Sequence, residues 1–338
     1  QRSSCNFFRS LGLDYLYVGE GNDIPSLIAA FAKVKDTSRP TVVHIHTQKG
    51  KGYAPAEADR EEFHWEMPFD LETGKPKVDC SGMEDYHSLT GKFLLEKMKE
   101  DHTVVAISSG TPTVIGFTPE RRKQAGRQFV DVGIAEEHAV ALASGIAAGG
   151  GRLVYGVYST FVQRCYDQLS QDLCINGNPA VITVFMGTVA GMNDVTHLGF
   201  FDIPLISNIP NMVYLAPTCS EEYFAMLEWA VRQTEYPVAI RVPGAAVVHR
   251  KEEFDTDYSE LNRYKMTARG ETVAILALGA FYDLGQALKN KLREESGVEA
   301  TLINPRYITG LDEPMLEELK VGPVSYTHLR AHETSAHL

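Results

Sequence analysis

Cysteine is scarce in this sequence, and its few copies are not grouped. The 338-residue chain has five cysteines, and no two of them form a C-x-x-C pair. A disulfide framework needs many cysteines, usually in an even number, and a cysteine zinc site needs closely spaced pairs. This odd and widely spaced set therefore argues against both classes and predicts a reducing, cytoplasmic location. The five are Cys5, Cys80, Cys165, Cys174 and Cys219.

Basic residues are also fewer than acidic ones. The chain has 32 basic and 44 acidic residues, for a net charge of −12. A protein with this field repels phosphate, so neither nucleic acid nor an anionic membrane surface is expected as a partner. A small anionic substrate held by one or two local arginines remains compatible with this balance.

Long hydrophobic runs are missing as well. No apolar stretch approaches the roughly 20 residues that a membrane-spanning helix needs, so no membrane partner is expected. Residues 1–5 contain neither an initiator methionine nor the apolar core of a signal peptide. We therefore expect this chain to be part of a longer protein.

Apolar runs of strand length alternate with helical stretches along most of the chain. Continuous apolar strands joined by short connections are typical of a parallel sheet covered on both faces. The pattern predicts an α/β fold with doubly wound parallel sheets. The expected strands are 41–46, 103–108, 128–132, 153–157, 180–185, 212–216 and 238–242, and the expected helices include 25–35, 88–99, 134–148, 161–175 and 220–233.

Two polar stretches divide the pattern into domains. Residues 51–85 are charged and proline-containing, and they are too numerous for an ordinary loop. Residues 251–267 form a second polar stretch, after which a new β-α-β unit begins. The predicted domains are 1–85, 86–250 and an incomplete third domain over 251–320.

Residues 325–338 show almost no periodicity but contain three histidines, His328, His332 and His337. A metal-binding tail is one interpretation. A non-native remnant is favoured, because the stretch is short and without pattern, contains no cysteine, and resembles a translated adapter sequence. We therefore leave this stretch out of the predicted fold.

Glu136 follows a predicted strand and opens a predicted helix, in the segment Phe129-Val-Asp-Val-Gly-Ile-Ala-Glu-Glu-His. This places it at the carboxyl edge of a parallel sheet, where open α/β sheets bind ligands. A glutamate in a first helical turn is also a common complement to the helix dipole. Taken alone, Glu136 favours that ordinary role over catalysis.

Two other segments approach the same sheet edge. Tyr158, Phe161 and Arg164 follow the next strand, and together they suggest an aromatic platform with an anion clamp. Phe161 alone would be read as a core residue. His197 follows a later strand in a glycine-rich loop, where a lone histidine is more often a surface residue than a catalyst.

These segments resemble a known family. The strings around Glu136, Tyr158-Ser-Thr-Phe-Val-Gln-Arg164 and Thr-His197-x-Gly-x-Phe-Asp202 are similar to 1-deoxy-D-xylulose-5-phosphate synthases, which are transketolase-like thiamine diphosphate enzymes. Upstream, the string from His44 to Glu57 and Glu62-Phe-His64 match the end of that family's first domain. The resemblance runs from about residue 7 to about residue 320.

The resemblance implies a function for the whole protein. Members decarboxylate pyruvate and condense the remainder with glyceraldehyde 3-phosphate, a step in the biosynthesis of isoprenoid precursors, thiamine and pyridoxal. The cofactors implied are thiamine diphosphate, the usual carrier for this chemistry, and Mg²⁺. The Gly-Asp-Gly…Asn motif for Mg²⁺ is not in this sequence, so its ligands are expected in a missing N-terminal segment and the fragment is expected to be inactive. A cytoplasmic homodimer is also implied.

The resemblance also implies residue roles. Glu136 would hydrogen-bond the cofactor's aminopyrimidine ring, Phe161 would stack on that ring, and Lys49 would contact the cofactor. His64 and His197 would transfer protons near the reacting carbon, which suits the pKa range of histidine. The expected substrate-binding residues are Tyr158, Arg164, Arg241 and Asn193.

The sequence departs from the family at the acceptor end. Met186 stands where an arginine that binds the acceptor's phosphate is expected, and Asn193 or Asp194 stands where the family has an aspartate. Losing one charge-assisted contact removes about 1.5–3 kcal/mol of interaction. Three alternatives therefore stay open: a paralogue with another aldehyde acceptor, a different thiamine enzyme such as a transketolase or a 2-oxoacid dehydrogenase β-type subunit, and a non-catalytic domain.

Overall fold

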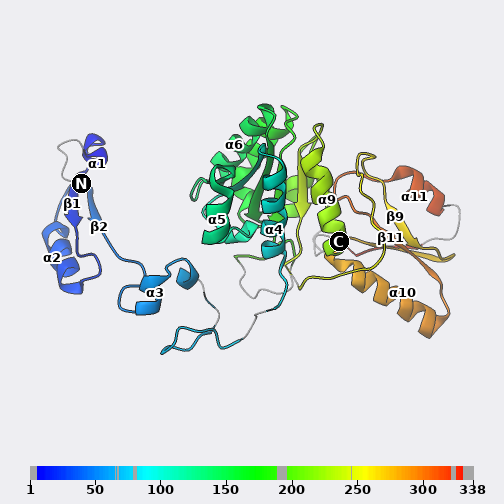
Figure 1. Cartoon of the computed structure of the whole chain (residues 1–338), viewed down its shortest axis with the longest axis horizontal. Helices are drawn as coiled ribbons and strands as arrows, with labels where there is room; N and C mark the ends of the chain where they lie inside the picture. The colour runs from blue at the N-terminus through cyan, green and yellow to red at the C-terminus, as the bar shows by residue number, and fades with distance from the viewer. Residues whose placement is uncertain are drawn as a thin grey trace. The chain divides into compact units, whose positions relative to one another are not determined.

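The chain forms two compact units, Gln1–Met83 and Glu84–Leu338. The structure is a computed structural model, and it describes residues 6–64, 66, 68–78, 82–188, 196–244, 246–320 and 325–329. Figure 1 shows the chain coloured from blue at its N-terminus to red at its C-terminus, with many of its helices and some of its strands labelled.

The first unit contains a small parallel β-α-β motif. Strand β1 (Asp14–Val18) pairs with β2 (Thr41–Ile45), and helix α2 (Ile24–Val34) connects them. Asp23 caps α2, because its carboxylate accepts the backbone N–H of Ser26 at 2.8 Å. The unit also contains α1 (Phe7–Ser10), α3 (Ala54–Ala58) and the short helix η1 (Glu62–His64).

A six-stranded sheet forms the centre of the second unit, in the order β4-β3-β5-β6-β8-β7. Every neighbouring pair is parallel, which confirms the predicted doubly wound α/β fold. The chain leaves β3 toward β4 on one side and returns to β5 on the other, so the strand order reverses at β3. The strands are β3 (Val104–Ser108), β4 (Phe129–Asp131), β5 (Arg152–Tyr158), β6 (Val181–Phe185), β7 (Val213–Leu215) and β8 (Val238–Arg241).

Alternate residues of these strands enter two separate cores, one on each face of the sheet. Helices α4 (Tyr86–Glu100) and α9 (Ser220–Arg232) pack on one face, and α6 (Glu136–Ala148) packs on the other. Figure 1 shows these three helices around the sheet. Burial on both faces explains why the strands are continuously apolar. The remaining helices here are η2 (Pro112–Ile115), α5 (Pro119–Ala125), η3 (Gly126–Gln128) and α8 (Asp202–Ser207).

The helix predicted over 161–175 is helical but not uniformly wound. It consists of the 3₁₀ turn η4 (Val162–Cys165), the α-turn α7 (Tyr166–Gln168) and the π-helix η5 (Leu169–Cys174). The hydrophobic pattern did not reveal this, because the 3₁₀ turn buries Val162 and the π-helix buries Leu169 and Leu173 in the same core, as one continuous helix would. Stretches of π-helix are frequent at functional sites, and this one directly follows the candidate site residues.

A four-stranded sheet completes the second unit, in the order β12-β10-β11-β9. The stretch 325–338 was not expected to be part of the fold, but it contributes strand β12, which is parallel to β10. An edge strand of five residues shows little periodicity, so the sequence did not predict it. The elements are β9 (Lys265–Ala268), β10 (Val273–Ala277), η6 (Gly279–Phe281), α10 (Tyr282–Ser296), β11 (Ala300–Asn304), α11 (Glu313–Lys320) and β12 (Ser325–Leu329).

Helices in the described part of the chain are short. The longest, α4 and α10, have 15 residues each. Within the described ranges, no helix combines the length and the apolar character needed to cross a membrane.

Candidate functional site

Glu136 is the first residue of α6 and lies at the carboxyl edge of the six-stranded sheet. The chain turns into the helix through Gly133, whose φ of 73° belongs to the left-handed region that favours glycine. Asp131 fixes this turn, because its Oδ1 accepts the backbone N–H groups of Gly133 at 2.8 Å and of Gly110 at 3.0 Å. The carboxylate of Glu136 is thus brought to the strand reversal, where α/β sheets bind ligands.

The Glu136 side chain is buried and paired. Only 2% of the residue is exposed. Nη1 of Arg164 donates to both carboxylate oxygens, at 3.1 Å to Oε1 and 3.2 Å to Oε2. A buried carboxylate needs such a partner to stay charged, so Arg164 compensates the charge of Glu136 in this structure.

Three ring side chains meet beside this ion pair. The ring centroids of Tyr158 and Phe161 are 5.4 Å apart, those of Tyr158 and His197 5.3 Å, and those of Phe161 and His197 5.5 Å. The guanidinium of Arg164 lies 5.8 Å from the Phe161 ring centroid. The structure therefore brings together five of the residues singled out from the sequence.

His87, which the sequence analysis did not single out, lies beneath this group. Its ring stacks on Phe185 with 4.8 Å between centroids, and its centroid is 6.3 Å from that of Tyr158. Nδ1 contacts the carbonyl oxygen of Val114 at 2.6 Å. Burial lowers the pKa of His87, so the ring is neutral at neutral pH. Its position in the first turn of α4, far from the motifs in sequence, gave no signal.

Arg241 lies at the end of β8 and forms a buried ion pair with Asp202. Its Nε is 2.6 Å from Oδ2 of Asp202, and the two side chains are 7% and 0% exposed. Its Nη2 also donates to the carbonyl oxygen of Gly199 at 3.0 Å. The hydroxyl of Tyr214 donates to the same Asp202 oxygen at 2.7 Å. Arg241 thus ties the end of β8 to the segment that carries His197.

Met186 follows β6 and has a φ of 58°, which is unusual for a residue with a side chain. Its carbonyl oxygen accepts the hydroxyl of Ser159 at 3.0 Å. A Cβ atom on Gly244 would lie 2.8 Å from the sulfur of Met186, so the thioether fills the space beside Gly244. Met186 is 8% exposed and presents no charge at this edge.

The remaining predicted site residues are Lys49, His64 and Asn193. Lys49 and His64 belong to the first unit, where Nζ of Lys49 lies 2.6 Å from Nδ1 of His64. Asn193 and the neighbouring Asp194 lie outside the described residues.

Cys165 follows Arg164 and is buried. Burial, together with the negative charge of Glu136, raises the pKa of Cys165 to about 12, so this thiol stays protonated. Across the described ranges, no group of three or more histidine, cysteine and carboxylate side chains is placed to hold a metal ion.

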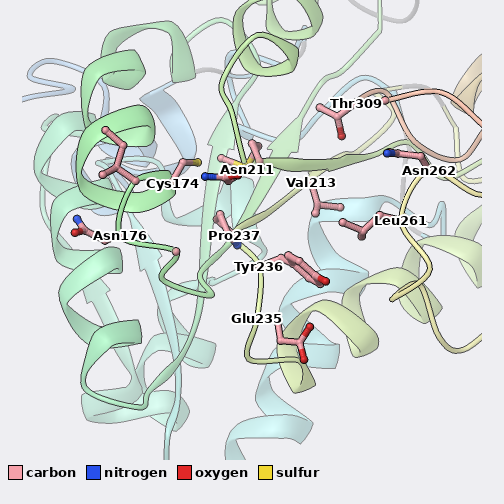
Figure 2. A pocket seen from close by; sticks show the side chains of 14 residues that line it. Cys174, Asn176, Asn211, Val213, Glu235, Tyr236, Pro237, Leu261, Asn262 and Thr309 are labelled. Atoms are coloured by element: carbon pink, nitrogen blue, oxygen red, sulfur yellow. The ribbon is translucent and has the colours of Figure 1, made fainter.

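A cavity of about 410 Å³ lies at the opposite, amino edge of the same sheet (Figure 2). It lies where the chain enters β6, β7 and β8, and the segments before β9 and after β11 close it from the other sheet. Its described lining contains no lysine, arginine or histidine. The lining is Cys174, Ile175, Asn176, Gly177, Asn211, Met212, Val213, Glu235, Tyr236, Pro237, Leu261, Asn262, Thr309 and Gly310.

Comparison with protein families identifies the central part of the chain. Residues 84–247 match the family model described as "Transketolase, pyrimidine binding domain". Among curated proteins, 1-deoxy-D-xylulose-5-phosphate synthase of Clostridium botulinum is 36% identical over 324 residues, which cover 93% of this chain and 50% of that protein. The synthase 1 of Geobacter sulfurreducens is 36% identical over 309 residues, covering 91% and 48%. The chain spans about half the length of these relatives.

Solved structures share the fold at lower sequence identity. A Pichia stipitis transketolase mutant in complex with fructose 6-phosphate has a TM-score of 0.63 at 15% identity, covering 97% of this chain and 61% of that one. A split-gene transketolase described as an inactive β4 tetramer has a TM-score of 0.57 at 21% identity, covering 71% and 77%. At these identities the likeness concerns the fold alone.

Proposed function

We propose that this chain belongs to the 1-deoxy-D-xylulose-5-phosphate synthase family of transketolase-like enzymes and that the whole protein is a thiamine diphosphate-dependent transferase. Its reaction would decarboxylate pyruvate and join the remaining two-carbon unit to an aldehyde, which the family resemblance implies is glyceraldehyde 3-phosphate. The observation that carries the proposal is the buried carboxylate of Glu136 beside the rings of Phe161, Tyr158 and His197.

These residues suit the pyrimidine half of thiamine diphosphate. A buried carboxylate can hydrogen-bond a ring nitrogen, and Phe161 offers an aromatic face to stack on. In the proposed site, Glu136 and Phe161 hold the aminopyrimidine and Lys49 contacts the cofactor. Mg²⁺ with the diphosphate would be bound by residues of the whole protein outside this chain.

When bound, thiamine diphosphate would supply a positively charged ring that takes up the electron pair left on the substrate when carbon dioxide departs. The side chains then have positioning and proton-transfer roles. We assign proton transfer to His64 and His197, and substrate contacts to Tyr158, Arg164, Arg241 and Asn193. Burial raises the pKa of Tyr158, so its hydroxyl remains a donor at neutral pH.

A second candidate is a paralogue that uses another aldehyde. The specific observation in its favour is the buried, uncharged side chain of Met186 at the position where the family's arginine is expected. For the assembly and location we propose a cytoplasmic homodimer, as the family resemblance implies.

Glu136→Gln tests the proposed function in the whole protein supplied with thiamine diphosphate, Mg²⁺, pyruvate and an aldehyde. The amide keeps the size of the side chain but cannot act as a carboxylate toward the ring nitrogen. We expect release of carbon dioxide to fall by about 10²–10³-fold, the scale seen when one preorganised polar group is removed. Glu137→Gln is the matched control, because Glu137 is the next residue and is exposed. Undiminished carbon dioxide release by the Glu136 variant would refute the proposal.

A further inference from the structure

We propose that Lys49 and His64 form a proton relay, in which Lys49 supplies, through His64, the proton that the aldehyde oxygen gains in the reaction. This inference rests on the proposed function, which assigns proton transfer to His64. It gives Lys49 a second role beside its contact with the cofactor. Both residues belong to the first unit, Gln1–Met83, and the contacts that carry the inference lie within it.

The two side chains meet at their nitrogen atoms. Nζ of Lys49 lies 2.6 Å from Nδ1 of His64. A lysine ammonium has three N–H donors and no acceptor, so it can donate only to a ring nitrogen that carries no proton. The neutral ring of His64 then has its proton on Nε2. This leaves Nε2 as the nitrogen that can donate to a substrate.

The loop that carries Lys49 is held on both sides of that residue. The carboxylate of Glu57 accepts the side-chain amide N–H of Gln48 at 2.8 Å and the backbone N–H of Gly52 at 2.8 Å. Gly50 has a φ of 80°, and a Cβ atom there would lie 2.6 Å from backbone atoms of helix α3. The loop therefore packs directly on α3, and the backbone of Lys49 has a defined place.

His64 is the last residue of the short helix η1, which is anchored by its neighbour Phe63. The ring of Phe63 packs edge-on against Tyr53, with 5.6 Å between centroids, and against Phe69, with 5.3 Å. Oδ1 of Asp59 accepts the first backbone N–H of η1 at 3.0 Å. Because Tyr53 immediately precedes α3, this packing fixes His64 relative to the same helix that holds the lysine loop.

The pair can hold one positive charge in two arrangements. In the first, Lys49 is an ammonium and the ring of His64 is neutral. In the second, the proton has moved from Nζ to Nδ1, so the ring is the cation and the lysine is a neutral amine. Two groups in such contact titrate as a pair, and the transfer leaves their total charge unchanged. The contact therefore allows Nδ1 to gain a proton as Nε2 loses one.

The reaction balances with this relay. The bond between the carboxylate and keto carbons of pyruvate breaks, carbon dioxide leaves, and the electron pair of that bond forms the new bond to the aldehyde carbon. The aldehyde oxygen takes the proton of Nε2 of His64, and Nδ1 takes one from Nζ of Lys49. Both side chains are exposed, so solvent can return a proton to the lysine. Pyruvate, aldehyde and one proton thus give an α-hydroxy ketone and carbon dioxide.

Lys49→Arg separates proton supply from charge and hydrogen bonding. Arginine keeps a positive charge and N–H donors, but its guanidinium does not give up a proton in proteins. With the whole enzyme and saturating cofactor and substrates, we expect kcat to fall by about 10²-fold, the lower end of what general acid–base catalysis contributes. Lys51→Arg is the matched control, because Lys51 is an exposed lysine of the same loop, and its kcat should stay native. A native kcat in Lys49→Arg would overturn the relay.

Rescue by small amines gives a readout that a merely structural role would not change. In Lys49→Ala, methylammonium and guanidinium can each replace the lost charge and N–H donors, but only methylammonium gives up a proton readily. The relay predicts that methylamine raises kcat and that guanidinium at the same concentration does not. Equal rescue by both cations, or rescue by neither, would overturn it.

Calorimetric titration with thiamine diphosphate separates the relay from the cofactor contact. Lys49→Arg retains the positive charge, so we expect it to bind the cofactor as the native protein does while its kcat is low. A loss of cofactor affinity that accounts for the whole loss of turnover would limit Lys49 to the cofactor contact and overturn the relay.

Failure of the inference is distinguishable from failure of the proposed function. If the native protein releases carbon dioxide from pyruvate but Lys49→Arg turns over normally, the function stands and the relay fails. If the native protein releases no carbon dioxide with thiamine diphosphate, Mg²⁺, pyruvate and an aldehyde present, the proposed function fails, and the relay falls with it.

Discussion

The two edges of the six-stranded sheet differ in the side chains that they present. At the carboxyl edge, two buried carboxylates are each paired with an arginine, Glu136 with the partly exposed Arg164 and Asp202 with the buried Arg241, beside a group of rings. At the amino edge, the cavity in Figure 2 is lined by amides, apolar groups and the exposed Glu235, and its described lining includes no basic residue. The same strands therefore supply both a polar, preorganised edge and an open, weakly charged one.

In the proposed site, buried charge rather than cavity volume marks the place of the chemistry. Buried charges are costly, so they persist where geometry and partners are fixed and are a better sign of a functional site. The carboxyl edge has such charges, together with fixed turns and the reversal of the strand order. The main feature of the amino edge is the cavity. The predictions below compare the consequences of altering each edge.

Asp202→Ala should have the largest effect on stability. It leaves the buried guanidinium of Arg241 without its carboxylate, and breaking a buried pair costs about 3–5 kcal/mol of unfolding free energy. Chemical denaturation followed by circular dichroism measures this loss. Adding Arg241→Met to the same protein should recover part of it, because the unpaired charge is removed; a double variant less stable than Asp202→Ala alone would contradict the account.

The protonation of His87 should change the free energy of unfolding by less than Asp202→Ala does. Its pKa is lowered by burial, so below about 6.5, the unperturbed value, the unfolded chain binds a proton that the folded chain does not. Stability should therefore fall as the pH drops from about 6.5 toward the lowered pKa, by at most about 1.4 kcal/mol per pH unit. Denaturation at several pH values measures the slope, and His87→Gln should reduce it; an unchanged slope would mean that another group titrates.

Glu235→Gln, at the amino edge, should have the smallest effect. The side chain is exposed, and surface substitutions away from special features usually change stability by no more than about 0.5 kcal/mol. We also expect unchanged affinity for thiamine diphosphate in calorimetric titration of the whole protein. A weakened affinity would mean that the amino edge affects cofactor binding, which contradicts the distinction between the two edges.

The sequence predicted the sheet well because its strands are buried on both faces and appear as continuous apolar runs, as in β5 and β6. It also predicted that Glu136, Phe161 and His197 converge, because each follows a parallel strand of the same sheet. It could not predict the pairing of Arg241 with Asp202, since two residues 39 positions apart give no local pattern. His87 was not predicted for the same reason. Strand β12 was not predicted because a short edge strand shows little periodicity.

Hydrogen–deuterium exchange of the whole protein with and without thiamine diphosphate and Mg²⁺ tests the central claim most directly. The account predicts that amides of residues 133–139 and 158–165, at the carboxyl edge, exchange more slowly when the cofactor is present. Amides of residues 174–177, 211–213 and 235–237, around the amino-edge cavity, should exchange at unchanged rates. Protection confined to the amino-edge segments, with none near Glu136, would contradict the account.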